Sequence, residues 1–227
     1  MATGRGRKEN PRTPAGPFAV KVFIDPDQTA ATQMARDHQL FERALLGERS
    51  ARIYQWDQTW ITLGRFQKPE ETLVEPSTMN WTIRETGGAA VLHGHDLTVA
   101  IAIPLSGTVG VRAVYRYLVT PLVLSLQDVG LDAILGEDAG FADRQTGAYC
   151  FLGKSENDVV SISTAQKLCG CALRVTREAA MLQASIPLRE PLVPARKQIR
   201  DSGNDSWVNL DQDGLIQSLQ VRIAALG

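Results

Sequence analysis

Residues 84–93 read Arg84-Glu-Thr-Gly-Gly-Ala-Ala-Val-Leu-His93, and the chain continues as Gly-His-Asp-Leu-Thr to Thr98. In this stretch a Gly-Gly pair separates a charged residue from an apolar run. Glycine has no Cβ, so such a pair lets the main chain approach a ligand closely and reach positive φ without strain. By itself the pattern more often marks an ordinary turn between two strands. It therefore predicts a turn whose bare backbone N–H groups are available to a ligand.

A second informative segment lies downstream. It opens with Cys150-Phe151, passes Asn157-Asp158 before two valines, and runs from Gln166 through Lys167-Leu-Cys-Gly170 to Ala172. A thiol is the best covalent nucleophile for acyl transfer, and a nearby cation lowers its pKa. An ammonium group beside a carbonyl stabilises developing negative charge. We therefore expect Cys150 and Lys167 to carry the chemistry; the ordinary alternatives are a small buried cysteine and a solvated lysine.

Together the two segments resemble the biotin/lipoate protein ligase superfamily, and within it the lipoate ligase and cysteine-type octanoyltransferase branches. Those enzymes carry Arg-Arg-x-Thr-Gly-Gly-Gly-Ala-Val-x-His, then an acidic residue before paired valines, then a lysine three residues before a glycine. Further stretches occur in the family's order. Residues 34–37 resemble its first-helix signature, residues 63–67 its second motif and residues 184–188 its final strand. The resemblance covers roughly residues 20–190.

The resemblance implies roles for particular residues. It implies that Cys150 is the catalytic nucleophile and that Lys167 contacts the acyl carbonyl. The backbone of Gly87 and Gly88 would hold an acyl thioester or an adenylate phosphate through its N–H groups. The full set of implied substrate-binding residues is Arg84, Thr86, Gly87, Gly88, His93, Asp158 and Gly170.

The implied reaction is octanoyl transfer. Cys150 would accept octanoate from octanoyl-acyl carrier protein and pass it to the lysine of a lipoyl domain, with no tightly bound cofactor. The implied acceptors are acyltransferase subunits of 2-oxoacid dehydrogenases and the glycine cleavage H protein. One alternative is a lipoate–protein ligase that forms lipoyl-adenylate from ATP, Mg²⁺ and lipoate. Another is a non-catalytic relative that binds lipoyl domains or acyl groups. Only about 40 residues follow Pro187, which leaves no room for the accessory domain of ATP-dependent ligases and favours the transferase.

Four positions depart from the family pattern. Ala89 replaces the third glycine, Glu85 stands where a second arginine is expected, and Cys171 replaces a serine. The His-Gly pair before the final strand is shortened to Ala184. These departures do not affect Cys150 or Lys167, but they leave the identity of the acyl group open.

Composition excludes several classes of protein. The 227 residues include 24 basic and 25 acidic ones, a net charge of −1, so no global charge favours nucleic acid or an anionic membrane. No apolar run approaches the ~20 residues of a membrane span, and no secretory signal is evident, which predicts a cytoplasmic protein. Three cysteines argue against a disulfide framework. The pairs His93-x-His95 and Cys169-x-Cys171 could suit zinc, but their spacing is not that of a zinc knuckle, so we expect no metal.

The periodicity of apolar residues predicts an α+β fold with a mixed, largely antiparallel sheet flanked by helices. The resemblance implies the catalytic fold of class II aminoacyl-tRNA synthetases and biotin synthetases. Residues 1–17 are predicted to be a disordered basic tail rich in Pro and Gly, and residues 18–227 one catalytic domain without an accessory domain. A helix capped by Asp27 or Thr29 should run to about residue 46, with others at 109–129 and 210–226. Predicted strands are 18–24, 51–56 and 59–63 (as a hairpin), 80–84, 89–92, 97–104, 159–162, 167–175 and 179–186.

Overall fold

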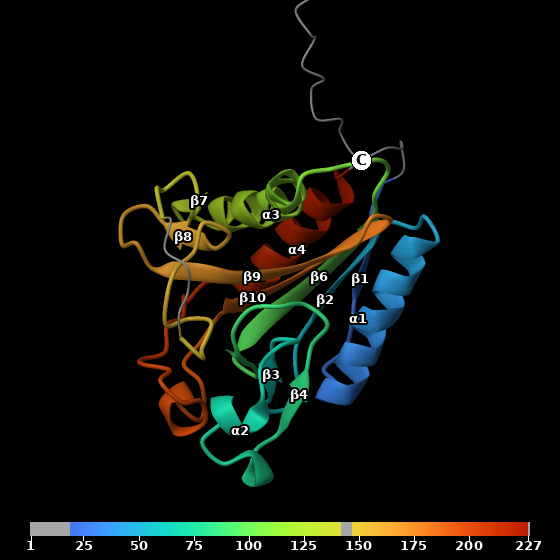
Figure 1. Cartoon of the computed structure of the whole chain (residues 1–227). Helices are drawn as coiled ribbons and strands as arrows, with labels where there is room; N and C mark the ends of the chain where they lie inside the picture. The colour runs from blue at the N-terminus through green and yellow to red at the C-terminus, as the bar shows by residue number, and fades with distance from the viewer. Residues whose placement is uncertain (1–18, 142–146, 227) are drawn as a thin grey trace, which may run out of the picture.

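The computed structural model describes residues 19–141 and 147–226, so the predicted tail at residues 1–17 lies outside the described residues. A seven-stranded sheet in the order β1-β2-β6-β10-β9-β8-β7 forms the centre of the molecule (Figure 1). Only β1 and β2 pair in parallel; every other neighbouring pair is antiparallel. The strands are β1 Lys21–Ile24, β2 Ser50–Tyr54, β6 Asp96–Pro104, β7 Ala133–Leu135, β8 Val159–Ser161, β9 Lys167–Val175 and β10 Ala179–Pro187.

A second, three-stranded sheet has the order β4-β3-β5. Its strands are β3 Ile61–Leu63, β4 Trp81–Ile83 and β5 Val91–Leu92. The predicted hairpin between residues 51–56 and 59–63 is therefore wrong, because β2 and β3 belong to different sheets. All five residues of β2 are buried, and the strand pairs on both edges, with β1 and β6. An interior place in the large sheet leaves no free edge for β3.

Helices cover both faces of the large sheet. They are α1 Ala30–Leu45, α3 Val111–Asp128 and α4 Gln212–Ala224. The short helix α2 covers Pro69–Thr72. Helices α3 and α4 pack on one face, while α1 and the small sheet lie on the other (Figure 1). The three long helices are confirmed close to their predicted ends, and Thr29 caps α1 by accepting a hydrogen bond from the Thr32 N–H. Pro121 lies inside α3 without ending it, and neither α2 nor β7 was predicted.

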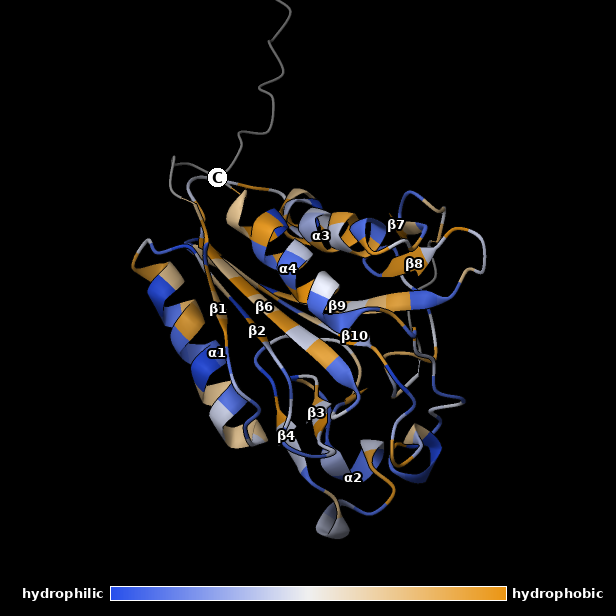
Figure 2. Ribbon diagram, turned by 180° about the vertical axis from the view of Figure 1, so that it is seen from behind, coloured by the Kyte–Doolittle hydropathy of each residue, from blue (hydrophilic) through white to orange (hydrophobic). Residues whose placement is uncertain are grey.

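Strand β6 shows how the two faces of the large sheet differ. Leu97, Val99, Ile101 and Ile103 face the main core together with α3 and α4, whereas Ala100 and Ala102 face the cluster that contains α1. Side chains of a strand alternate between faces, so one apolar strand serves both. Figure 2 shows the resulting apolar character of β1 and β6. The small alanines let α1 approach the sheet closely.

The mixed, mostly antiparallel sheets with helices on both faces confirm the predicted α+β class. Within residues 19–141 and 147–226, none of the helices combines the length and the apolar character that crossing a lipid bilayer requires. The glycine stretch follows β4, and the Cys150 segment pairs with residue Ala90 just before β5 through an isolated bridge between Ala90 and Tyr149. The fold thus brings the two informative segments of the sequence side by side.

His95 leads to a stability prediction. It is buried, and neither ring nitrogen hydrogen-bonds to any described residue. Burial lowers the pKa of His95, so the unfolded chain binds a proton more readily than the folded chain. Stability should therefore fall as the pH drops below about 6.5, the ordinary histidine value. His95→Leu should stabilise the fold by about 1 kcal/mol at about pH 5.5 and by less at about pH 7.5. Urea unfolding at both pH values checks this; equal pH dependence in the two proteins would contradict it.

Candidate active site

A cavity lies between the large sheet and the small one. The cavity is narrow, with a volume of about 30 Å³. Its floor comes from the face of the large sheet that carries α1, and its roof from β3, β5 and the residues that follow β4. The lining residues are Met34, Tyr54, Trp56, Thr62, Arg84, Val91, His93, Thr98, Cys150, Gly170, Cys171, Ala172, Gln183, Ala184 and Ser185.

The predicted nucleophile and lysine meet at this cavity. Lys167 Nζ lies 3.4 Å from Cys150 Sγ and donates to the Cys150 carbonyl at 2.6 Å. It also lies 2.9 Å from Asp158 Oδ2. All three side chains are at least nine-tenths buried. A thiol, an ammonium and a carboxylate from three separated stretches of sequence therefore form one buried cluster.

The local sequence explains how Asp158 is held. It ends the loop before β8, where its Oδ2 accepts hydrogen bonds from the Ser155 N–H at 2.7 Å and the Ser155 hydroxyl at 2.9 Å. Asp158 thus holds the loop that ends before the strand, the ordinary role weighed for it from sequence. The ion pair with Lys167 shows that Asp158 also contacts the site. One carboxylate thus shapes the loop and fixes the lysine.

Burial determines the resting charges of the cluster. Burial raises the pKa of the Cys150 thiol; the Lys167 ammonium opposes this, but the net shift is upward. Burial lowers the pKa of Lys167, but Cys150 and Asp158 more than offset it, so that its pKa is raised. At neutral pH the resting site therefore holds a protonated lysine next to an un-ionised thiol.

Gly170 makes room for the thiol. A Cβ at this position would lie 2.8 Å from Cys150 Sγ, closer than carbon and sulfur can approach. Gly170→Ala should therefore displace the thiol at a cost of about 1–3 kcal/mol and slow alkylation of Cys150 by about tenfold or more. Rates of iodoacetamide labelling at Cys150, read by peptide mass spectrometry, test this. Gly110→Ala is the matched control, because a Cβ there meets nothing within 4 Å. An unchanged labelling rate in Gly170→Ala would contradict the expectation.

The glycine stretch forms a loop with unpaired N–H groups. Gly88 has φ +86, which a residue with a side chain rarely adopts. Its carbonyl packs so closely on Gly64 that a Cβ on Gly64 would lie 1.9 Å from the oxygen, which explains the glycine of the second motif. The backbone N–H groups of Gly87, Gly88 and Ala89 donate to no described residue. They therefore remain available to an anion or an acyl oxygen.

The Arg84 side chain holds this loop in place through hydrogen bonds. Its guanidinium donates to the carbonyls of Gly87 at 2.6 Å and Ala89 at 2.8 Å. Further hydrogen bonds go to the Thr86 hydroxyl at 3.1 Å and to the carbonyl and hydroxyl of Thr62. The N–H and C=O of a trans peptide point in opposite directions, so the Gly88 N–H points away from Arg84. Arg84 thus uses its donors on protein oxygens and holds the loop carbonyls inward.

His93 is fixed by neighbours on three sides. Its Nε2 lies 2.9 Å from the Thr62 hydroxyl, its Nδ1 lies 2.8 Å from Asp96 Oδ2, and its ring stacks on Trp56 with centroids 4.1 Å apart. Asp96 also accepts from the Ser185 hydroxyl at 2.6 Å. Burial raises the pKa of Asp96, but His93 and the hydrogen bonds outweigh it and lower that pKa to about 2. Asp96 is therefore ionised, an anchor for His93 that sequence reasoning missed although His-x-x-Asp is visible in the chain.

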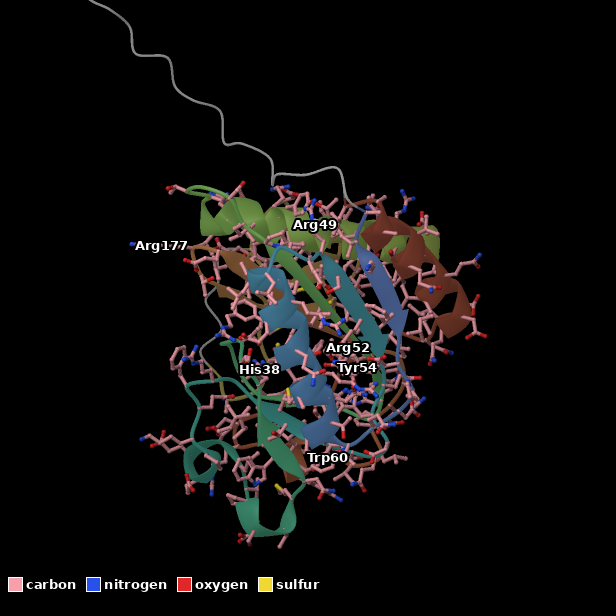
Figure 3. All side chains as sticks on the ribbon, turned by 90° about the vertical axis from the view of Figure 1, so that its right-hand side faces the viewer. His38, Arg49, Arg52, Tyr54, Trp60 and Arg177 are labelled. Carbon is pink, nitrogen blue, oxygen red and sulfur yellow. The ribbon has the colours of Figure 1, made fainter. Side chains whose placement is uncertain are left out.

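A buried polar network connects the loop to α1, and sequence reasoning missed this too. The Thr86 hydroxyl donates to Gln183 Oε1 at 2.7 Å, and Gln183 Nε2 donates to Asp37 Oδ2 at 2.6 Å. Asp37 also accepts from the Tyr54 hydroxyl at 2.7 Å and pairs with Arg52. Arg52 and Tyr54 lie side by side on β2, behind α1 in Figure 3. Asp37 belongs to the first-helix signature, which was the only available signal.

The structure thus brings most of the predicted residues to one place. Cys150, Gly170, Arg84 and His93 line the cavity, and Lys167 and Asp158 lie behind the thiol. Thr86 is fully buried behind Arg84 and does not line the cavity. Among the described residues no group of three or more His, Cys, Asp or Glu side chains could hold a metal ion.

Glu85 and Ala184 have clear surroundings. Because Thr86 directly follows Glu85, Glu85 falls on the variable position of Arg-Arg-x-Thr and Arg84 on the second arginine, so the expectation that Glu85 replaces an arginine is wrong. The Glu85 carboxylate faces outward, where it pairs with Arg174 and lies 2.6 Å from His38 Nδ1. It therefore places no charge in the cavity. Ala184 lines the cavity, opposite Val99 on β6 and Cys171 on β9. The shortening of this strand thus bears on the shape of the cavity rather than on its charge.

A glycine loop over a mixed sheet, with a buried thiol, lysine and carboxylate beside it, defines a protein of the biotin/lipoate protein ligase superfamily. Residues 29–204 match the sequence profile of the family described as "Lipoyl protein ligase A/B catalytic domain". The chain belongs to that family.

Two proteins whose sequences are similar to this chain are both described as octanoyltransferases. The octanoyltransferase LipM of Carboxydothermus hydrogenoformans is 32% identical over 138 residues, 56% of this chain and 50% of that protein. The octanoyltransferase LipM of an Exiguobacterium species is 30% identical over 179 residues, 70% of this chain and 62% of that protein. The chain therefore spans between half and two thirds of these relatives. A bi-partite lipoate protein ligase of Thermoplasma acidophilum has the same fold, with a TM-score of 0.70, 18% identity, and coverage of 92% of this chain and 84% of that one.

Proposed function

We propose that this protein is an acyltransferase that attaches an octanoyl group to the lysine of a lipoyl domain through a thioester on Cys150. The observation that carries the proposal is the distance of 3.4 Å between Lys167 Nζ and Cys150 Sγ at the wall of the cavity. A cation at this distance favours the thiolate and a developing oxyanion alike. The two relatives described as octanoyltransferases support the same reaction.

In the first step Cys150 sulfur attacks the carbonyl of octanoyl-acyl carrier protein. The new C–S bond forms, the carrier thiolate leaves, and the proton of the Cys150 thiol ends on the carrier sulfur. Because burial raises the pKa of Cys150, the thiol holds this proton at neutral pH before the donor binds. The protonated Lys167 and the free N–H groups at residues 87–89 would stabilise the tetrahedral oxyanion.

In the second step the neutral amine of the acceptor lysine attacks the Cys150 thioester. An amide bond forms, the C–S bond breaks, and the amine proton returns to Cys150 as the thiol. No ATP, metal ion or tightly bound cofactor enters either step. The acceptors would be lipoyl-domain proteins, such as the acyltransferase subunits of 2-oxoacid dehydrogenases and the glycine cleavage H protein.

Intact mass spectrometry tests the proposal. The purified protein is incubated with octanoyl-acyl carrier protein without ATP, and a mass gain of one octanoyl group that hydroxylamine removes is expected on Cys150. Transfer to a lipoyl domain should follow when that domain is added. If no adduct forms, and the lipoyl domain is instead modified with free lipoate and ATP, the protein is a lipoate–protein ligase. If neither the adduct nor modification of the lipoyl domain is detected, the result would favour a non-catalytic relative that binds lipoyl domains or acyl groups.

A further inference from the structure

The charges around the cavity do not cancel. The Lys167 ammonium and the Asp158 carboxylate are 2.9 Å apart and together carry no net charge. His93 faces the ionised Asp96. Arg84 is the exception: within residues 19–141 and 147–226 no carboxylate forms an ion pair with it. In the described part of the chain, Arg84 is therefore a cation of the cavity wall without a carboxylate partner, whereas Lys167 is paired with Asp158.

The surroundings of Arg84 make this arrangement unusual. Its side chain is 5% exposed, and its five hydrogen bonds all go to neutral oxygens of Thr62, Thr86, Gly87 and Ala89. Buried guanidinium groups are normally paired with a carboxylate, because neutral oxygens offset only part of the lost hydration. Burial accordingly lowers the pKa of Arg84, and a negative charge on Cys150 would raise it again. The wall of the site thus holds a cation that lacks an anion until a negative charge forms in the cavity.

We propose that Arg84, a buried cation without a carboxylate partner, supplies the positive charge that stabilises the Cys150 thiolate and the oxyanion of acyl transfer, while Lys167, paired with Asp158, orients the thiol and acts on the oxyanion as a hydrogen-bond donor. This assignment rests on the proposed function in one respect, namely that Cys150 is the acyl acceptor. It gives Arg84 a role that needs no hydrogen bond to the substrate, since its donors are already engaged on the loop.

The other groups that face Cys150 fit the assignment. Tyr115 approaches from α3, and Cys169 and Cys171 lie on β9. Burial raises the pKa of Tyr115 well above its ordinary value, so the phenol is neutral at neutral pH. The pKa of Cys171 is also raised well above its ordinary value, by its contact with Cys169 and by burial. Tyr115 and Cys171 therefore add no charge at neutral pH, and Asp158 is already paired with Lys167.

The experiment measures the ionisation of Cys150 without any acyl donor. The rate of iodoacetamide labelling at Cys150 is followed against pH by peptide mass spectrometry. The ultraviolet absorbance of the thiolate, taken as a difference from Cys150→Ser, gives the same pKa independently of reagent access. Arg84→Gln should raise the pKa of Cys150 by about one unit or more. The double variant Lys167→Met/Asp158→Asn, which removes the pair without a net change of charge, should shift it by less.

Two further variants separate charge from loop structure. Arg84→Lys keeps the charge but loses the fork of hydrogen bonds, and it should leave the pKa of Cys150 near that of the wild type. Thr86→Val removes one hydrogen bond to Arg84 and keeps the charge, so it should behave in the same way. If Arg84→Gln does not fold, a wild-type thiol pKa in Arg84→Lys together with a smaller shift in the double variant still supports the proposal.

A larger shift in the double variant than in Arg84→Gln would overturn the proposal, because Lys167 would then be the source of the field. So would an equal rise in Arg84→Lys and Arg84→Gln, which would mean that only the loop structure matters. Failure of the proposed function is distinguishable from these results. If Cys150 gains no octanoyl group but its pKa follows the charge at position 84, the acyl acceptor is wrong and the charge assignment stands.

Discussion

Replacing Cys150 by alanine should lower the rate of octanoyl transfer from acyl carrier protein by at least about 10³-fold and abolish the hydroxylamine-labile adduct. The reason is that, in the proposed mechanism, the sulfur forms the bond that splits the reaction into two steps, and this sulfur lies 3.4 Å from Lys167 Nζ at the wall of the cavity. The measurement is octanoylation of a lipoyl domain, followed by intact mass spectrometry, with adduct formation on the enzyme recorded separately.

Cys171→Ala is the matched control for this variant. Cys171 also lines the cavity, but its thiol lies 3.7 Å from Cys169 and makes no contact with Lys167. It should retain most of the wild-type rate. If Cys150→Ala instead kept its activity, and that activity required ATP, the covalent mechanism would be excluded. Lys167 and the glycine loop would then bind a lipoyl-adenylate.

Replacing Lys167 by methionine should lower kcat by about 10²- to 10³-fold, the cost of losing one donor to a developing oxyanion. Methionine keeps much of the length and apolar volume of the side chain but removes the ammonium that contacts Cys150 and Asp158. Formation of the thioester and its transfer to the acceptor should both slow, because an oxyanion forms in each step. Single-turnover kinetics with octanoyl-acyl carrier protein separate the two steps.

The single variant leaves Asp158 buried without its cation, which by itself can unfold the protein. The double variant Lys167→Met/Asp158→Asn avoids that charge and should fold like the wild type while remaining slow. Lys154→Met is the control on the same loop, where the ammonium lies over the Phe141 ring rather than in the site. Wild-type kcat in the folded double variant would show that Lys167 has no role in the chemistry.

The pH dependence of thioester formation should follow the thiol. Since burial raises the pKa of Cys150 above its ordinary value, reaction with a neutral thiol reagent should accelerate as the pH rises through that raised pKa. The same site in Gly170→Ala should react slowly at every pH, because the thiol is displaced rather than protonated.

Local sequence patterns were enough to predict several helices and strands. Apolar residues at helical spacing determined α1, α3 and α4, and the period-two pattern with turn residues determined β6, β9 and β10. The pair Cys150 and Lys167 was also visible, because a thiol and a cation suit acyl chemistry and their order resembles a known family. The short strand β7 and helix α2 were missed, since three or four residues carry too little periodic signal.

Pairing of strands could not be predicted from local patterns. An alternating strand has the same sequence signal whichever neighbour it pairs with, so residues 51–63 suggested a hairpin. In the folded chain β2 pairs with β6, whose partner residues are far away in sequence, and β3 lies in the second sheet. That choice depends on burial of both faces of β2, which only the assembled sheet determines.

The sequence by itself determined which chemical groups are present, the glycine loop and the order of the motifs, because these depend on residue types and short spacings. Only the tertiary structure decided that Asp158 neutralises Lys167, and that Arg84 has no carboxylate partner in the described part of the chain. It also decided that Gln183 reaches Asp37 across 146 positions of sequence. The physical reason is that burial and charge pairing depend on which distant segments meet, and that information is absent from any single stretch of the chain.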